Sequence, residues 1–89
     1  MNIYVIDGLT IEDPEQLHDA LQAALPLPEY YGRNLDALYD ILTEWREDFT
    51  LRIDSCDQML SALELYGVRF LRMLNDAANE NEHFTIDLE

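Results

Sequence analysis

Hydrophobic and polar residues follow two different periods along this 89-residue chain, one typical of strands and one typical of helices. Short apolar runs bounded by turn residues predict three β-strands. These runs cover Ile3 to Asp7, Phe49 to Ile53 and Phe84 to Leu88. The first run is almost wholly apolar before Gly8 ends it, which predicts a buried strand.

Apolar residues spaced three and four apart predict helices between these strands. The first helix begins with an N-cap at Asp13, a proline at position 14 and a capping-box glutamine at position 16, and Pro26 stops it. Its inner face is expected to carry Leu17, Ala20, Leu21 and Ala24. The second helix follows an N-cap at Asn34, able to accept a hydrogen bond from the first turn.

Two further helices are predicted after the second strand. Met59, Leu60 and Leu63 mark a short helix that is expected to end near Gly67, because glycine is common just past helix ends. A fourth helix carries Phe70, Leu71, Leu74, Ala77 and Ala78 on one face. Strands that alternate with helices predict a small α/β domain with a parallel sheet and right-handed crossovers, formed by residues 1 to 89 as a single unit.

The predicted helix after Asn34 separates two kinds of residue. At about 100° per residue, the inner arc holds Leu35, Leu38, Ile41, Leu42 and Trp45. The opposite arc holds Asp36, Asp40, Thr43 and Glu44, with Tyr39 on the border. Asp36 and Asp40 are four residues apart and repel each other in an isolated helix, so the pair suggests an external cation.

The segment before this helix is rich in residues that favour protein contacts. Pro28 favours an ordered extended loop, and Gly32 is expected to make the turn into the helix. Tyr30 and Tyr31 stand beside the acidic helix, and tyrosine is enriched among interface anchors.

The charge balance limits the possible ligands. The formal net charge is −14, and all five basic residues other than histidine are arginines. Nucleic acid is disfavoured as a direct ligand because phosphate binding requires a basic patch. A cationic protein partner is favoured, since opposite fields raise the rate of association.

The sequence favours neither catalysis nor the binding of a metal or cofactor. Asp36 and Asp40 on adjacent turns of an exposed helix lack the burial that separates the pKa values of two catalytic carboxyls, so we expect no enzyme activity. His18 and His83 lack metal-ligand spacing, so no metal or cofactor is expected. A lone Cys56, no 18-residue apolar run and no secretion signal lead us to expect a cytoplasmic protein.

Residues 27 to 40 carry a long and specific motif, Leu-Pro-Glu-Tyr-Tyr-Gly-Arg-Asn-Leu-Asp-Ala-Leu-Tyr-Asp. This motif resembles the barstar family of ribonuclease inhibitors, and the similarity is collinear over nearly the whole chain. The resemblance implies a three-stranded parallel sheet with four helices. It also implies that the motif helix and its preceding loop plug the active site of a barnase-type ribonuclease.

The resemblance assigns expected roles to particular residues. Asp40 would mimic the scissile phosphate, and Asp36 would meet a flanking cation. Apolar contact would come from the three tyrosines of the motif, while the loop would be held by its glycine and asparagine; the full expected set is Tyr30, Tyr31, Gly32, Asn34, Asp36, Tyr39, Asp40, Thr43 and Asp76. Asp76 is included because family members carry an acidic residue at this place in the fourth helix. We expect a monomer that forms a 1:1 complex.

Two positions depart from the family pattern. Tyr39 stands where barstar has a tryptophan, and Arg33 stands where barstar has an acid. Arg33 brings positive charge into the surface that is expected to meet a basic active site, unless it folds back onto Asp36 or pairs with an acid of the partner. Two alternatives stay open: an immunity protein or antitoxin against a different basic nuclease toxin, and an acidic adaptor with no nuclease target.

Overall fold

A three-stranded parallel sheet forms one layer of the molecule, which is described here by a computed structural model covering residues 2 to 89. The strands are β1 (Asn2–Asp7), β2 (Phe49–Asp54) and β3 (Phe84–Leu88), in the order β1-β2-β3. Both neighbouring pairs are parallel. The predicted sheet, with its long helical crossovers, is therefore confirmed.

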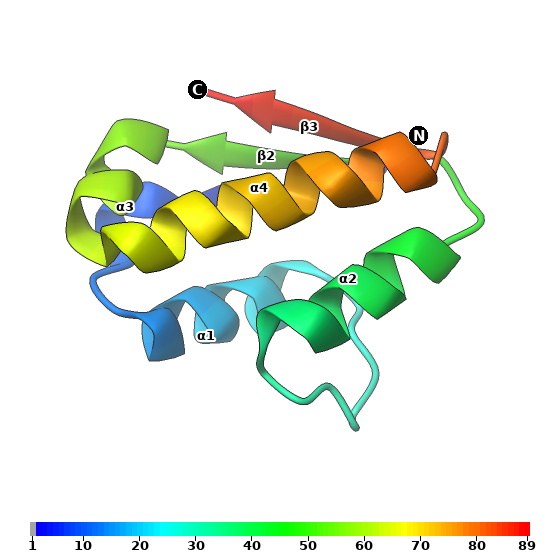
Figure 1. Ribbon diagram of the computed structural model, residues 1–89, viewed down its shortest axis with the longest axis horizontal. Helices are drawn as coiled ribbons and strands as arrows, with labels where there is room; N and C mark the ends of the chain where they lie inside the picture. The colour runs from blue at the N-terminus through cyan, green and yellow to red at the C-terminus, as the bar shows by residue number, and fades with distance from the viewer. Residues whose placement is uncertain (1) are drawn as a thin grey trace.

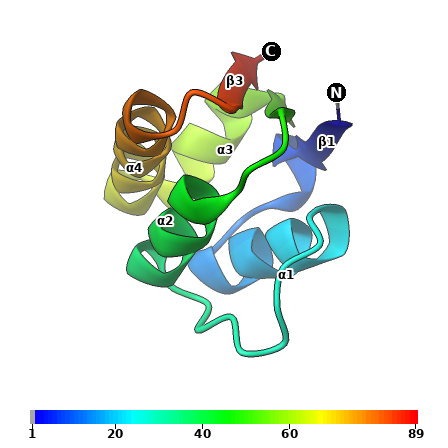
Figure 2. The same cartoon turned by 90° about the vertical axis from the view of Figure 1, so that its right-hand side faces the viewer.

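Helices form the second layer and lie on one face of the sheet (Figures 1 and 2). They are α1 (Pro14–Ala24), α2 (Leu35–Glu44), α3 (Cys56–Leu63) and α4 (Leu65–Glu80), with a short 3-10 turn, η1 (Gly8–Thr10), after β1. In the part of the chain that the structure describes, the four predicted helices are confirmed, and none of them is long and apolar enough to cross a membrane. Helix α1 packs on β1 and α4 on β3, while α2 packs against α4.

The core lies between the sheet and the helices. Phe49, Leu51 and Ile53 of the central strand are almost completely buried. The inner faces of α1 and α2 add Leu17, Leu21, Leu38 and Leu42, all fully buried as predicted from their spacing. Trp45, half-buried, stacks on Phe49 with ring centroids 4.3 Å apart.

Strand β1 corrects one prediction. Ile3 and Val5 are 62% and 45% exposed, and only Ile6 of the strand is buried. This strand is at the edge of the sheet, and Ile3 and Val5 alternate along it with Tyr4 and Ile6, which pack in the core. Ile3 and Val5 therefore lie on the opposite face of the sheet, and Figure 2 shows no helix on that face. A run of apolar residues therefore predicted the strand but wrongly predicted that both of its faces are buried.

The boundary between α3 and α4 corrects a second prediction. The chain turns at Glu64, whose φ is 55°, and Gly67 lies inside α4. A Cβ added at Gly67 would lie 3.2 Å from the Cβ of Leu63 and 3.1 Å from Leu60 Cδ2. Gly67 is thus explained by the close approach of two helices and does not end one.

Candidate functional site

The N-terminus of α2 is fixed by its capping residue. Asn34 Oδ1 accepts a hydrogen bond from the backbone N–H of Ala37 at 2.7 Å, and its Nδ2 donates to the carbonyl of Gly32 at 3.2 Å. The predicted N-cap is therefore confirmed. The turn before it differs from the prediction, because Arg33 adopts the left-handed conformation (φ 55°) and Gly32 does not.

Arg33 also binds residues of α1, which was not among the expected partners. Its guanidinium donates to Asp19 Oδ1 at 2.8 Å, to the carbonyl of Glu15 at 3.0 Å and to the side chain of Gln22. All three acceptors belong to α1, so Arg33 folds onto that helix and not onto Asp36. The arginine ties the loop to α1, and Asp19 balances its charge.

Three carboxylates follow the outer side of α2. Asp36, Asp40 and Glu44 are all exposed and are spaced four residues apart, with a rise of about 6 Å between successive positions. We call this row the acidic ridge. Its third member, Glu44, was not among the predicted site residues, although the same four-residue spacing could have identified it.

A hollow of about 270 Å³ lies between α2 and α4 and joins residues from both helices. It is lined by Leu35, Asp36, Tyr39, Arg69, Arg72, Met73 and Asp76. Three predicted site residues, Asp36, Tyr39 and Asp76, therefore share one surface feature, although 40 positions of sequence separate the first from the last.

Tyr39 lies among carboxylates in this region. Partial removal from water raises the pKa of its hydroxyl, and the charges of Glu80, Asp76 and Asp40 raise it further. The phenol therefore keeps its proton and can donate a hydrogen bond. Glu80 was missed by the sequence reasoning, although it lies four residues after Asp76 on the same helix.

On the other side of the acidic ridge lies Tyr30, which is 85% exposed. It borders a shallow depression of about 320 Å³ whose other lining residues are Pro26, Pro28, Ile41, Glu44 and Trp45. An exposed aromatic ring thus stands beside the ridge, with apolar surface around it. A tyrosine therefore flanks the ridge on each side, Tyr39 towards α4 and Tyr30 towards the loop.

Thr43 keeps its hydroxyl within the helix. Its Oγ1 donates to the carbonyl of Tyr39 at 2.9 Å and lies 3.2 Å from that of Asp40. The side chain borders a different hollow, beside Arg46 and the end of α4. Thr43 is therefore separate from the hollow that holds Asp36 and Asp76.

Tyr31, unlike Tyr30, is buried at 6% exposure and does not offer surface to a partner as expected. Its hydroxyl hydrogen-bonds to Nδ1 of His18, and Nε2 of the same ring lies 2.8 Å from the hydroxyl of Tyr66 in α4. His18 is 3% exposed, and burial together with the charge of Arg33 lowers its pKa despite the opposing effect of Asp19. The buried Tyr31 and His18, together with the half-buried Tyr66, anchor the loop to α1 and α4.

The C-terminus of α2 is held by Asn81, the buried residue that caps α4. Its Nδ2 donates to the carbonyls of Leu42 and Trp45 at 2.7 and 2.8 Å. Carbonyls at a helix end lack partners within the helix, so this amide satisfies two of them. No local sequence signal predicted the contact, because Asn81 and Leu42 are 39 positions apart.

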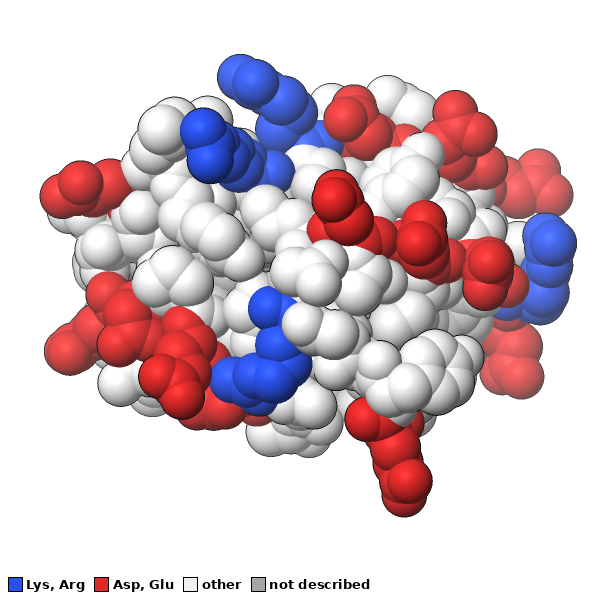
Figure 3. All heavy atoms as spheres, turned by 60° about the horizontal axis from the view of Figure 1, so that its bottom comes forward, with Lys and Arg blue, Asp and Glu red and all other residues white. Residues whose placement is uncertain are grey.

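Carboxylates gather over α2 and the end of α4 on the face shown in Figure 3. This face presents no enclosed cavity around Asp36 and Asp40, both of which are exposed. It combines carboxylate side chains with the aromatic rings of Tyr30 and Tyr39.

Comparison with known proteins agrees with this geometry. A model of the family described as "Barstar (barnase inhibitor)" matches residues 1 to 89. The chain belongs to the barstar family. It is also 38% identical over 91 aligned residues to a Bacillus subtilis (strain 168) protein named "Putative ribonuclease inhibitor YrdF", and the alignment covers both proteins completely.

Proposed function

We propose that this protein inhibits a basic ribonuclease of the barnase type by placing the acidic ridge of α2 in the nuclease active site. The observation that carries the proposal is the ridge itself, three exposed carboxylates with a tyrosine on each side, in a chain of the barstar family. The similarity to a protein named as a ribonuclease inhibitor supports the same target class.

The inhibition would work by phosphate mimicry. A ribonuclease binds the phosphates of its substrate with cationic side chains, and the Asp40 carboxylate would occupy the place of the scissile phosphate. Asp36 would pair with a flanking cation, and Asp76 would add a further charge from α4. Charge-assisted hydrogen bonds are roughly twice as strong as neutral ones, which favours carboxylates as the mimic.

The tyrosines would exclude water from these ion pairs. Tyr30 and Tyr39 stand on opposite sides of the ridge, so a docked nuclease would cover both rings and desolvate the charges between them. Tyr31 and Asn34 would contribute indirectly, since they hold the loop and the start of α2 in place. The protein would block the nuclease without doing chemistry of its own, as a monomer in a 1:1 complex in the cytoplasm.

Titration of barnase with the purified protein tests the proposal. RNA cleavage should fall linearly and reach zero near equimolar protein, and the protein alone should cleave no RNA. Asp40→Asn should weaken the affinity by roughly 2–5 kcal/mol, because it leaves a cation of the nuclease buried and unpaired. Asp87→Asn on the uncovered face of the sheet is the matched control and should change the affinity little.

Two results would contradict the proposal. RNA cleavage by the pure protein that depends on Asp36 or Asp40 would indicate an enzyme. A wild-type affinity of Asp40→Asn for barnase would show that α2 is not the inhibitory surface. Inhibition of a basic DNase but not of barnase would instead favour an immunity protein against another class of nuclease toxin.

A further inference from the structure

Two arginines lie on the wall of the acidic hollow, although the chain as a whole is strongly acidic. Arg69 and Arg72 are exposed on successive turns of α4 and line the same hollow as Asp36, Tyr39 and Asp76. We call them the arginine pair. They give the expected contact surface one positive side and one negative side (Figure 3).

The arginine pair has no partner within residues 2 to 89. Arg33 and Arg52, by contrast, form ion pairs with Asp19 and Asp54 at 2.8 and 2.7 Å. No ion pair or hydrogen bond joins either member of the arginine pair to a carboxylate of residues 2 to 89. Their guanidinium groups are therefore available to an outside ligand.

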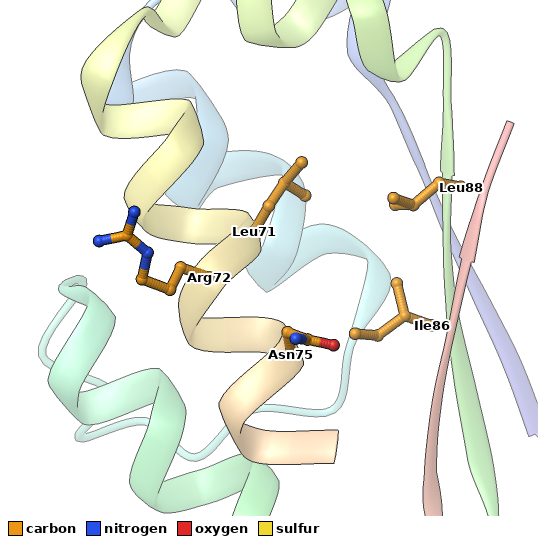
Figure 4. Close-up of a pocket in the computed structure, with 5 residues that line it drawn as sticks. All are labelled: Leu71, Arg72, Asn75, Ile86 and Leu88. Atoms are coloured by element: carbon orange, nitrogen blue, oxygen red, sulfur yellow. The ribbon is translucent and has the colours of Figure 1, made fainter. Parts of the chain in front are cut away.

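The guanidinium of Arg72 projects away from β3. Arg72 also lines a groove on the β3 side of α4, together with Leu71, Asn75, Ile86 and Leu88. Figure 4 shows its guanidinium on the opposite side of the helix from Ile86 and Leu88. The charge of Arg72 therefore belongs to the α2 side of α4, where the hollow lies.

Two unpaired arginines beside a surface that binds a basic protein would weaken that binding by electrostatic repulsion. Two unit charges about 7 Å apart interact by roughly 0.6 kcal/mol in water and about 2 kcal/mol near a protein surface. Each arginine would oppose a nuclease cation that approached the hollow. A carboxylate of the partner at this place would reverse the sign of the interaction, and the planar fork of arginine suits a carboxylate well.

The dimensions and lining of the hollow also fit an amino-acid side chain. A volume of about 270 Å³ is enough for one carboxylate side chain, and Leu35 and Met73 offer apolar surface for its stem. A nucleic-acid phosphate is the less suitable ligand, because the net charge of −14 would repel a polyanion.

We propose that the arginine pair binds an aspartate or glutamate side chain on the rim of the nuclease's basic cleft and so determines which ribonuclease the protein accepts. This inference rests on the proposed function, because the same nuclease must dock on α2. It assigns a partner with a bipolar surface, cationic where it meets the acidic ridge and acidic where it meets the start of α4. Nucleases that lack the carboxylate would be rejected by repulsion.

Stopped-flow kinetics with barnase as the probe test this assignment. Arg72→Gln and the control Arg52→Gln both change the net charge from −14 to −15, so a difference between them does not come from net charge. Arg52 lies on β2 and is already paired with Asp54, so it controls for charge without touching the hollow.

The proposal expects the two variants to differ in dissociation. Arg72→Gln should raise the dissociation rate about tenfold or more, while Arg52→Gln should leave it within about twofold. Arg72→Lys, which keeps the charge but loses the fork, should fall between wild type and Arg72→Gln. Replacing the matching barnase carboxylate by its amide should produce no further loss in Arg72→Gln.

Three further results would decide against the proposal or against the function on which it rests. An unchanged or slower dissociation of Arg72→Gln would overturn it. A lower melting temperature of Arg72→Gln with unchanged dissociation would also overturn it, since the arginine would then only balance Asp36 and Asp76 inside the free protein. No binding of barnase by either the wild-type protein or Arg72→Gln would instead contradict the proposed function itself, whereas binding by Arg72→Gln alone would identify barnase as a nuclease that the arginine pair rejects.

Discussion

Replacing Asn81 by alanine should destabilise the protein and release the C-terminal end of α2. The side chain is 4% exposed and makes three hydrogen bonds, two to the carbonyls of Leu42 and Trp45 and one from the N–H of His83 at 3.0 Å. Alanine removes all three and leaves two helix-end carbonyls without their partner. The contact with Leu42 is buried, so water cannot readily replace it.

The size of the effect follows from these contacts. A buried polar group left unpaired costs about 1–3 kcal/mol, and the Trp45 carbonyl is only partly buried, so we expect a total loss of roughly 2–4 kcal/mol. For a domain of this size the melting temperature should fall by about 10–25 °C. Urea unfolding and thermal melts followed by circular dichroism would measure both quantities.

Asn79→Ala is the matched control, since Asn79 is exposed on the same helix and makes no such contact with α2. Its stability should change by no more than about 0.5 kcal/mol. Asn81→Asp tests the chemistry more closely, because it keeps the shape but directs a carboxylate at two carbonyl oxygens. A melting temperature of Asn81→Ala or Asn81→Asp close to wild type would refute the anchoring role.

Two further predictions concern backbone contact and pH. A Cβ at Gly8 would clash with the backbone carbonyl of Ser55 and lie 2.7 Å from that of Asp54, so Gly8→Ala should cost about 3 kcal/mol in urea unfolding. A Cβ at Gly32 would lie 3.1 Å from Asn34 Nδ2, a side-chain atom that can shift, so Gly32→Ala should cost clearly less; equal stabilities would contradict this. Burial lowers the pKa of His18 below 6.5, so at mildly acidic pH the folded protein binds fewer protons than the unfolded chain. The contribution of the neutral imidazole to the free energy of unfolding is complete above pH 6.5. It is lost as the pH falls through the lowered pKa. Melts from pH 7 to 5 should show this loss in wild type and a weaker one in His18→Gln, and identical slopes would be evidence against it.

The start and inner face of α2 could be predicted from the sequence because their causes are local. The Asn34 cap acts over three residues, and Leu38 and Leu42 are buried because both lie on the stripe that faces the core. The same reasoning placed Asp36 and Asp40 on the exposed side, where the structure has them.

The errors arose where packing between two elements decides the outcome. Arg33 has a suitable acid three positions away, yet it binds Asp19 of α1, because the left-handed turn at Arg33 brings the loop against that helix. Gly67 carries the usual sign of a helix end, but it is required by the packing of α4 against Leu60 and Leu63 of α3, which directly precedes it. Neither contact follows from residue type and apolar spacing alone.

Contacts with α1 and with the end of α4 determine the position of the acidic ridge. Arg33 binds α1 at the surface, and Tyr31 binds His18 of α1 in the interior. Asn81 holds the C-terminal end of α2. None of these residues has its side chain on the ridge, so each can keep the face rigid without competing for the ligand. A surface that is ordered before binding loses less conformational entropy when it docks, so its affinity for the partner is higher. Changes at these supports should therefore weaken binding through the position of α2, while changes on the ridge should weaken it through lost charge pairs and leave the fold intact.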